Sequence, residues 1–348
     1  MLRYFRSSFI FTLLGLPLCA YVGYYYNPTP AAAIQAFFIA TVLAVLEVSL
    51  SFDNAIVNAV VLKEMTPKWR HRFLTWGMLI AVFGMRLVFP LLIVTFAAGL
   101  NPWDALVLAA SEPNRYSEIM LSAHANVAAF GGCFLMMVAL KYFYDENKEL
   151  HWIVWIERIT AELGKVEAIE IAITLGFLAV LSRWAPPEGQ ASFLISGMAG
   201  IVVYVVVDGI SGYLERFGAS SADMHRASAG LFLYLEVLDA SFSFDGVVGA
   251  FAITNNLFII MIGLSIGAFF VRSLTILFVE KETLDHFTYL EHGAFYAIGA
   301  LAILMLCDPV VHIPEWITGL IGAVFIAAAF WSSLRVRKMK SSAAMPAK

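Results

Sequence analysis

Charged residues are scarce in this sequence, and their scarcity excludes a soluble globular protein. Aspartate, glutamate, lysine and arginine make up 14% of the 348 residues, and 61% of the residues are hydrophobic, whereas a soluble domain has roughly 25% charged residues. Several stretches without any charge are long enough to cross a bilayer as a helix, namely 7–46, 189–207, 246–271 and 316–334. We therefore expect an all-α, polytopic helical membrane protein embedded in a lipid bilayer.

Cysteine is also rare, and no basic cluster is present. Cys19, Cys133 and Cys307 lie far apart in apolar stretches without a C-x-x-C pair, which predicts packed apolar side chains and not a thiolate metal site. The net charge is −4 and the basic residues are dispersed, so we expect no nucleic-acid partner. No glycine-rich nucleotide loop or H-E-x-x-H motif is present, so we expect neither an enzyme nor an organic cofactor.

Charged residues and Pro/Gly-rich stretches divide the chain into ten apolar segments, which predicts about nine to ten transmembrane helices. The segments lie near 9–26, 31–62, 73–97, 125–143, 167–184, 191–214, 228–254, 257–279, 291–308 and 315–334. The first resembles a signal peptide in its basic start, but no small-x-small cleavage site follows it. Its tyrosines at 24–26 are typical of an interfacial anchor. A retained anchor helix is the favoured interpretation.

The basic residues predict how the chain is oriented. If both termini are cytoplasmic and the spans alternate, all but four of the 22 lysines and arginines fall on the cytoplasmic side. Of those four, Arg115 and Arg183 fall outside, and Arg86 and Arg272 lie within spans. We expect an integral protein of the bacterial inner membrane, and association into a homo-oligomer stays open.

Two apolar segments contain nearly the same phrase, SLSFDN at 49–54 and SFSFDG at 241–246. In this register Glu47 aligns with Asp239. The following span of each copy has a glycine nine residues before an arginine, at 77 and 86 in the first copy and at 263 and 272 in the second. The span after that has a histidine seven residues before a glycine, at 124 and 131 and again at 292 and 299. Three spans are therefore duplicated, and the predicted topology inverts the second copy. Secondary transporters often have such inverted repeats, with the substrate site between them.

The repeat divides the chain into five regions. They are 1–30, an N-terminal anchor helix; 31–143, the first transmembrane repeat; 144–227, an amphipathic loop and linking transmembrane helices; 228–308, the second, inverted repeat; and 309–348, the last transmembrane helix and a basic cytoplasmic tail.

Acidic residues lie inside the two duplicated spans, at Glu47, Asp53, Glu236, Asp239 and Asp245. Each would cost about 2.5–3.5 kcal/mol if left unpaired in lipid, so they are expected to face the protein interior. Arg86 and Arg272 are the predicted counter-ions, and the remaining negative charge favours protons or metal cations.

Helical spacing places four polar residues, Glu47, Ser51, Asn54 and Asn58, on one face of their span, and Ser49 and Asp53 on another. Either this span is surrounded by protein, or it unwinds around 51–54 so that Asp53 and freed carbonyls point into a common cavity. Gly246 favours unwinding in the second copy, although close helix packing would also select glycine.

The available donors are carboxylate, amide, hydroxyl and carbonyl oxygens, which suit Mn²⁺, Mg²⁺ or Ca²⁺ as a transported substrate. Residues expected along an ion path are Glu236, Asp208, Ser51, Ser243, His124 and His292. One alternative stays open, in which Asp53 and Asp245 pair with Arg86 and Arg272 and only fix helix packing.

The segment 47–55, EVSLSFDNA, together with Asp239-x5-Asp245, resembles the signature of the TerC superfamily of membrane proteins, which is similar in organisation to LysE-type exporters. The resemblance covers about 31–308 and implies Mn²⁺ export or metal-ion homeostasis, with paired intramembrane acids as the ion site. Carried over to this sequence, it implies Asp53 and Asp245 as the leading metal ligands, completed by Glu47, Asp239 and Asn54. Gly246 replaces the serine usual in that family, and the first span is additional. The alternative function is a non-transporting scaffold that assists assembly or metallation of other membrane or exported proteins.

Overall fold

The computed structural model describes residues 3–343 except 146, 147, 149, 167, 185, 186, 188, 216–220, 282–286, 312 and 314, and except the side chains at 215, 221–223, 226, 244, 245, 315, 316, 319 and 338–343. This described part contains helices and their connections but no strand. The prediction of an all-helical chain is therefore confirmed.

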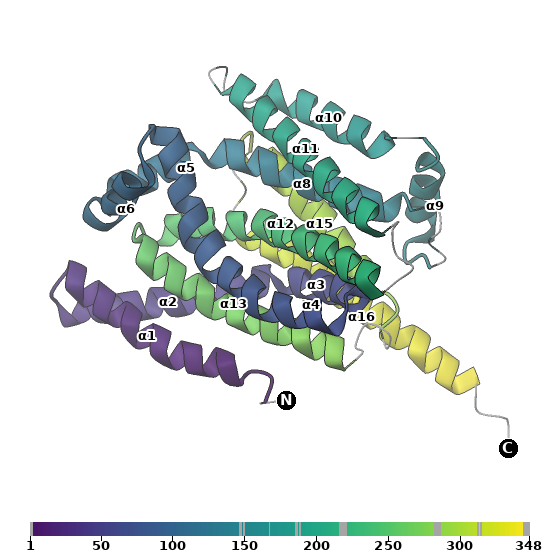
Figure 1. Ribbon diagram of the computed structural model, residues 1–348, viewed down its shortest axis with the longest axis horizontal. Helices are drawn as coiled ribbons and strands as arrows, with labels where there is room; N and C mark the ends of the chain where they lie inside the picture. Colours follow the sequence, from purple (N-terminus) through teal and green to yellow (C-terminus); the bar gives the residue numbers. More distant parts are fainter. Residues whose placement is uncertain are drawn as a thin grey trace.

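The helices follow one another along the chain with short connections (Figure 1). They are α1 (Arg6–Tyr26), α2 (Pro30–Leu50), α3 (Phe52–Glu64), α4 (Pro67–Arg72), the π-helices η1 (Phe73–Gly77) and η2 (Ile80–Val88), α5 (Phe89–Ala98), α6 (Pro102–Ser111), α7 (Pro113–Ser122), α8 (His124–Phe143), α9 (Val154–Leu163), α10 (Ile169–Ser182), α11 (Gln190–Glu215), α12 (Ser221–Ile253), α13 (Leu257–Glu280), α15 (Leu290–Cys307) and α16 (Glu315–Ala343).

Eight helical stretches of the described chain are both long and apolar enough to cross a membrane: α1, α2, the continuous run Pro67–Ala98, α8, α11, α13, α15 and most of α16. The expected nine to ten spans differ from these at α10 and α12. With 14 residues, α10 rises only about 21 Å, less than a typical hydrocarbon core. The 33 residues of α12 suffice in length, but this helix carries Glu236 and the acids after it.

The span 31–62 is divided at Ser51, whose φ of −103° and ψ of 18° end α2 before α3 begins. Unwinding around 51–54 was one of the two alternatives from the sequence, and the structure limits it to this one residue. In the second copy the expectation of unwinding was wrong, because α12 runs without a break through 241–246. Gly246 there serves close packing: a Cβ on it would lie 3.3 Å from Glu47 Oε2.

The third span is wound partly as a π-helix. Pro90 has no N–H to donate to the carbonyl of Arg86 four residues earlier, and its ring would press on that carbonyl in an α-helix. The wider π winding of η2 ends at Val88, directly before α5. This local change sets the direction in which Arg86 leaves the helix.

Helices of the first copy pack against helices of the second copy. α2 and α3 pack on α13, α12 packs on η2, and α8 packs on α15. In Figure 1 the run through α2 and α3 is antiparallel to α12. An inverted repeat predicts this exchange of partners, which encloses the acids of both copies.

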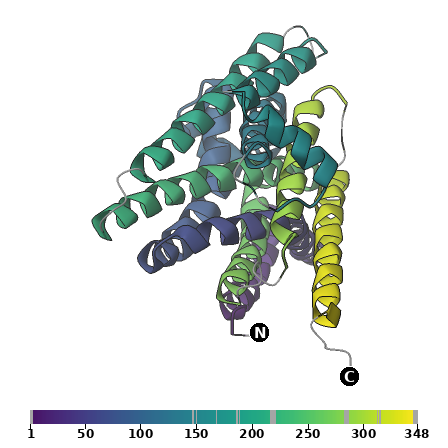
Figure 2. The same cartoon turned by 90° about the vertical axis from the view of Figure 1, so that its right-hand side faces the viewer.

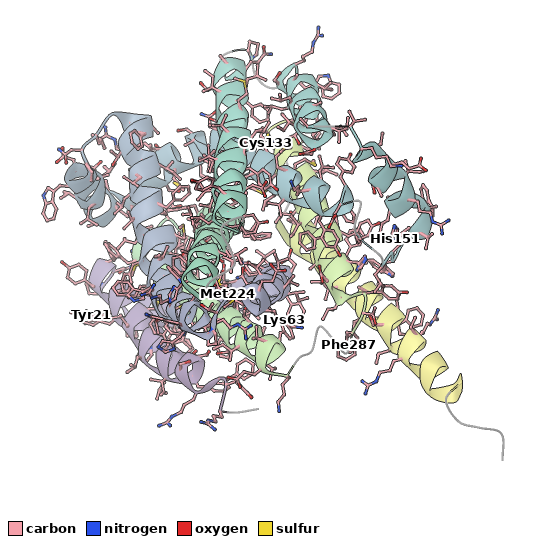
Figure 3. The ribbon with its side chains drawn as sticks, turned by 45° about the vertical axis from the view of Figure 1, so that its right-hand side comes forward. Tyr21, Lys63, Cys133, His151, Met224 and Phe287 are labelled. Atoms are coloured by element: carbon pink, nitrogen blue, oxygen red, sulfur yellow. The ribbon has the colours of Figure 1, made fainter. Side chains whose placement is uncertain are left out.

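The remaining helices surround this centre. α1 packs on α2 and α13, whereas α16 packs on α15 and stands at one edge of the bundle in Figure 2. Cys133, labelled in Figure 3, is fully buried, and all three cysteines are free thiols. Their predicted role as packed side chains holds for Cys19 and Cys133, while Cys307 is only half-buried.

Candidate cation site

A buried ion pair joins the first two spans of the first copy. Glu47 and Arg86 are 3% and 2% exposed, and the Arg86 guanidinium donates a hydrogen bond to Glu47 Oε1. The Ser51 hydroxyl donates to the same oxygen at 3.2 Å. Arg86 also donates to the Ala81 carbonyl at 2.5 Å, and its Nε has no hydrogen-bond partner. Arg86 therefore pairs with Glu47 and not with Asp53. The alternative in which Asp53 and Arg86 form a pair that only fixes helix packing predicted a different partner.

A second contact joins the two copies directly. Asn54 Nδ2 in α3 donates to Asp239 Oδ1 in α12 at 2.6 Å. One helical turn earlier, Glu236 is 8% exposed, and its Oε1 has no hydrogen-bond partner in the part of the chain that the structure describes. Glu236 reaches the backbone of η1, since a Cβ on Gly77 would lie 2.6 Å from Glu236 Oε1. A side chain at position 77 would therefore have to displace the Glu236 carboxylate.

Asp53 lies on the other side of the break. It is 5% exposed, and its Oδ1 accepts a hydrogen bond from the Asn54 N–H at 2.9 Å. No lysine or arginine side chain among the described residues forms an ion pair with it. Its Oδ2 faces α16, 3.9 Å from where a Cβ on Gly322 would be. The carboxylate is thus buried, and none of the described residues provides it with a cationic partner.

Two small cavities meet at this cluster. One, of about 30 Å³, is lined by Asp53, Gly246 and Gly322, and the other, of about 50 Å³, by Asn54, Glu236, Asp239, Arg86 and Arg272. Glu47 and Ser51 line both cavities. Each has room for a water molecule or a small ion. We call these two polar cavities the chambers, and the helix break and the Glu47–Arg86 pair lie between them.

Several predicted residues lie elsewhere. Asp208 is 3.6 Å from Lys141, His124 is 3.4 Å from Asp308, and His292 is 3.6 Å from Glu157. None of the three lines either of the two cavities.

In the second copy, Ser243 is buried without a partner for its hydroxyl, and the side chain of Asp245 lies outside the described residues. Within the residues described, no group of three His, Cys, Asp or Glu side chains is close enough to hold a metal ion.

Two residues of this region were not among the predicted site residues. Asn58 is 5% exposed, lines the larger chamber and leaves its Oδ1 without a partner. Its signal in the sequence is the helical spacing from Glu47, Ser51 and Asn54. Gly267 has its signal in the four-residue spacing from Gly263, which is typical of a close helix contact. That spacing does not identify the neighbour, Glu47, whose Cβ would lie 2.4 Å from a Cβ on Gly267.

The fold and this site define a polytopic helical membrane protein with a carboxylate-rich interior. The chain belongs to the family described as "Protein of unknown function (DUF475)", whose model matches residues 52–340. No curated protein and no solved structure matches the chain. The resemblance to the TerC superfamily stays a prediction.

Proposed function

We propose that this protein is a membrane transporter that exports a divalent metal cation from the cytoplasm, with Mn²⁺ as the first candidate and Mg²⁺ and Ca²⁺ as the other hard cations. The observation that carries the proposal is the pair of polar chambers that meet at Glu47 and Ser51, beside the break between α2 and α3. We place the chain in the bacterial inner membrane with both termini cytoplasmic.

The charge of the chambers supports a cationic substrate. Their described lining includes four carboxylates, Glu47, Asp53, Glu236 and Asp239, against two guanidinium groups, Arg86 and Arg272. Of these two arginines, only Arg86 forms an ion pair with a described residue. Unpaired carboxylates in a membrane interior are costly and accompany ion pathways. Oxygen donors suit Mn²⁺, and the TerC-like segment 47–55 supports the same choice.

The Glu47–Arg86 pair offers a means of control. A cation that binds Glu47 Oε1 competes with the Arg86 guanidinium for that oxygen. In the state described, the guanidinium holds the carboxylate between the chambers, so the passage is closed at this point. Release of Arg86 by an arriving cation would then open Glu47 to both chambers in turn.

The first prediction concerns flux. Mn²⁺ uptake into proteoliposomes with purified protein should fall to the level of empty vesicles in Asp53→Asn and Asp245→Asn, because each removes a carboxylate charge while keeping the side-chain size. Glu112→Gln is the matched control, since Glu112 is 57% exposed and far from the chambers. Full transport by both aspartate variants would sink the proposal. Competition with Ca²⁺, Mg²⁺ and Zn²⁺ would rank the cations.

One observation favours the second candidate, a scaffold that assists assembly or metallation of other proteins. Glu47 and Asp239 already have partners in Arg86 and Asn54, as structural groups would. A scaffold would show no wild-type flux above empty vesicles under several pH gradients. It would also keep its co-purifying partners in Asp53→Asn.

A further inference from the structure

Three buried side-chain oxygens around the larger chamber lack a hydrogen-bond partner. They are Asn54 Oδ1, Asn58 Oδ1 and Glu236 Oε1, and none of them is paired within the residues that the structure describes. All three residues line the cavity of about 50 Å³, and they are only 4%, 5% and 8% exposed, respectively. An unpaired buried polar group is unfavourable, so three of them around one cavity indicate a ligand.

The three oxygens come from two helices that belong to different copies of the repeat. Asn54 and Asn58 lie four residues apart on one face of α3, whereas Glu236 lies in α12, one turn before Asp239. The helices α3 and α12 pack on each other. Both copies therefore bring acceptors to the same chamber, as expected of a substrate site between inverted repeats.

One hydrogen bond fixes the orientation of the Asn54 amide. Its Nδ2 donates to Asp239 Oδ1 at 2.6 Å, so the other end of the amide is the carbonyl oxygen, which can only accept. An ionised carboxylate such as that of Glu236 also only accepts. The unpaired oxygens of the chamber therefore cannot pair with one another.

The two arginines of the chamber do not pair with these oxygens either. The Arg86 guanidinium donates to Glu47 and to the Ala81 carbonyl. Arg272 lines the chamber and forms no ion pair with a described residue. Unpaired oxygen acceptors suit a hard cation, whose ligands are carboxylates, amide carbonyls and water. Since no three acidic or histidine side chains converge in the described part of the chain, amide oxygens are needed to complete such a set.

We propose that Asn58 and Glu236 bind a divalent cation in the larger chamber through their unpaired oxygens. Asn54 and Asp239 complete this site, and water fills the remaining positions. The inference rests on the proposed function for the identity of the ligand, with Mn²⁺ as the first candidate. Asp53 lines only the smaller chamber, so the transported cation is held at two successive places.

The experiment measures binding of radioactive Mn²⁺ to the purified full-length chain in detergent by equilibrium dialysis. We expect saturable binding, with the Kd raised at least about tenfold in Asn58→Leu and in Glu236→Gln, because even outer-shell partners of metal ligands contribute about 10–100-fold to affinity. Both substitutions nearly keep the size of the side chain. The matched controls, Asn114→Leu and Glu112→Gln, change exposed residues and should bind Mn²⁺ like the wild type.

A change of metal preference separates direct ligation from a role in packing. Asn58→His offers an imidazole nitrogen in place of the amide oxygen, and imidazole suits Zn²⁺ better than Mn²⁺. The ratio of the Kd for Zn²⁺ to the Kd for Mn²⁺ should therefore fall in this variant. An unchanged ratio would contradict ligation by Asn58.

Thermal unfolding shows whether each variant is folded. Mn²⁺ should raise the Tm of the wild type, because it binds the folded state, and should raise the Tm of Asn58→Leu much less. Without metal, Asn58→Leu should unfold at the same or a higher temperature than the wild type, because an unpaired buried oxygen has been removed. A lower Tm without metal would identify a misfolded variant, and Glu236→Gln then decides.

Binding and flux together distinguish this inference from the transport proposal. Saturable Mn²⁺ binding that both variants weaken, without any wild-type flux, would overturn the transport proposal alone. Wild-type flux with equal Mn²⁺ binding in Asn58→Leu, Glu236→Gln and the wild type would overturn this inference alone. Absence of saturable binding of Mn²⁺, Mg²⁺ and Ca²⁺ would also overturn it.

Discussion

At the scale of single residues, Glu157 shows how one buried carboxylate fastens a loop to the bundle. It is 1% exposed, and its Oε1 accepts hydrogen bonds from the N–H groups of Trp152 and Ile153, both at 3.1 Å. Its Oε2 lies 3.2 Å from Lys148 Nζ, and the Tyr296 hydroxyl of α15 donates to Oε1 at 3.3 Å. The carboxylate thus ties the segment before α9 to α15.

This arrangement predicts acid sensitivity. Burial alone raises the pKa of Glu157, but the Ile153 N–H and the Lys148 ammonium outweigh it, so the pKa lies below its usual value. A carboxylate of this kind stabilises the fold at neutral pH. The stabilisation is lost as pH falls from about 4.3 through the lower folded-state pKa. Hydrogen exchange of 150–163, corrected for intrinsic rates, should therefore be constant from pH 8 to 5 and accelerate below about pH 4.

Glu157→Gln is the corresponding variant. It cannot gain or lose the charge, so its exchange should be faster than that of wild type at neutral pH and should lack the acid-dependent step. Glu112→Gln, at an exposed position, should retain the wild-type profile. An acid step of equal size in Glu157→Gln would assign the effect to another group.

The same scale shows what the sequence could predict about the site. Charges inside apolar segments are costly, which is enough to place Glu47, Asp53 and Arg86 in the interior. The partner of Arg86 could not be predicted, because it depends on the π winding of η2 and on a contact across 39 residues of chain. Glu157 carries no local signal, since its partners come from α15 and from irregular backbone.

At the scale of elements, α2 and α13 approach closely through Gly263 and Gly267. A Cβ on Gly263 would lie 2.9 Å from Leu43 Cβ, and one on Gly267 would lie 2.4 Å from Glu47 Cβ and 2.8 Å from the Ala44 carbonyl oxygen. Glycine spacing of four residues is typical of close contacts between membrane helices, and here it also positions the helix that carries Glu47.

We predict that Gly267→Ala destabilises the protein by about 1–3 kcal/mol, the usual cost of overpacking. The new methyl group meets backbone and Cβ atoms that cannot turn away. Gly209→Ala is the matched control, because nothing lies within 4 Å of its Cβ position in α11. Thermal unfolding in one detergent should show a lower Tm for Gly267→Ala and an unchanged or higher Tm for Gly209→Ala. Equal shifts would mean that the contact is not tight.

Element boundaries were predictable only in part. The apolar segments predicted where helices lie, because hydrophobic length dominates that signal. The break at Ser51 and the continuity of α12 were not separable from sequence, since 49–54 and 241–246 are nearly the same phrase. What distinguishes them is tertiary: Ser51 donates its hydroxyl to Glu47, whereas Gly246 packs against that glutamate.

At the scale of the whole molecule, the antiparallel course of α2–α3 and α12 leads to a prediction about membrane topology. The inverted repeat requires the run Pro67–Ala98, the second span of the first copy, to cross the membrane. Its two ends then lie on opposite sides. Lys68 in α4 lies at the start of that span, and Arg115 lies in α7, after its end. Both positions are exposed. The distribution of basic residues predicts that Lys68 is in the cytoplasm and Arg115 is outside.

Cysteine labelling tests this arrangement. In a chain whose native cysteines are replaced by alanine, a membrane-impermeant maleimide applied to intact spheroplasts should label Arg115→Cys. It should label Lys68→Cys only after permeabilisation. Labelling of both from outside would contradict the spanning run Pro67–Ala98 and with it the repeat. Labelling of Lys68→Cys from outside, and of Arg115→Cys only after permeabilisation, would preserve the repeat but invert the chain in the membrane. The proposed transport would then become import, and the flux assay would have to be repeated with the opposite gradient.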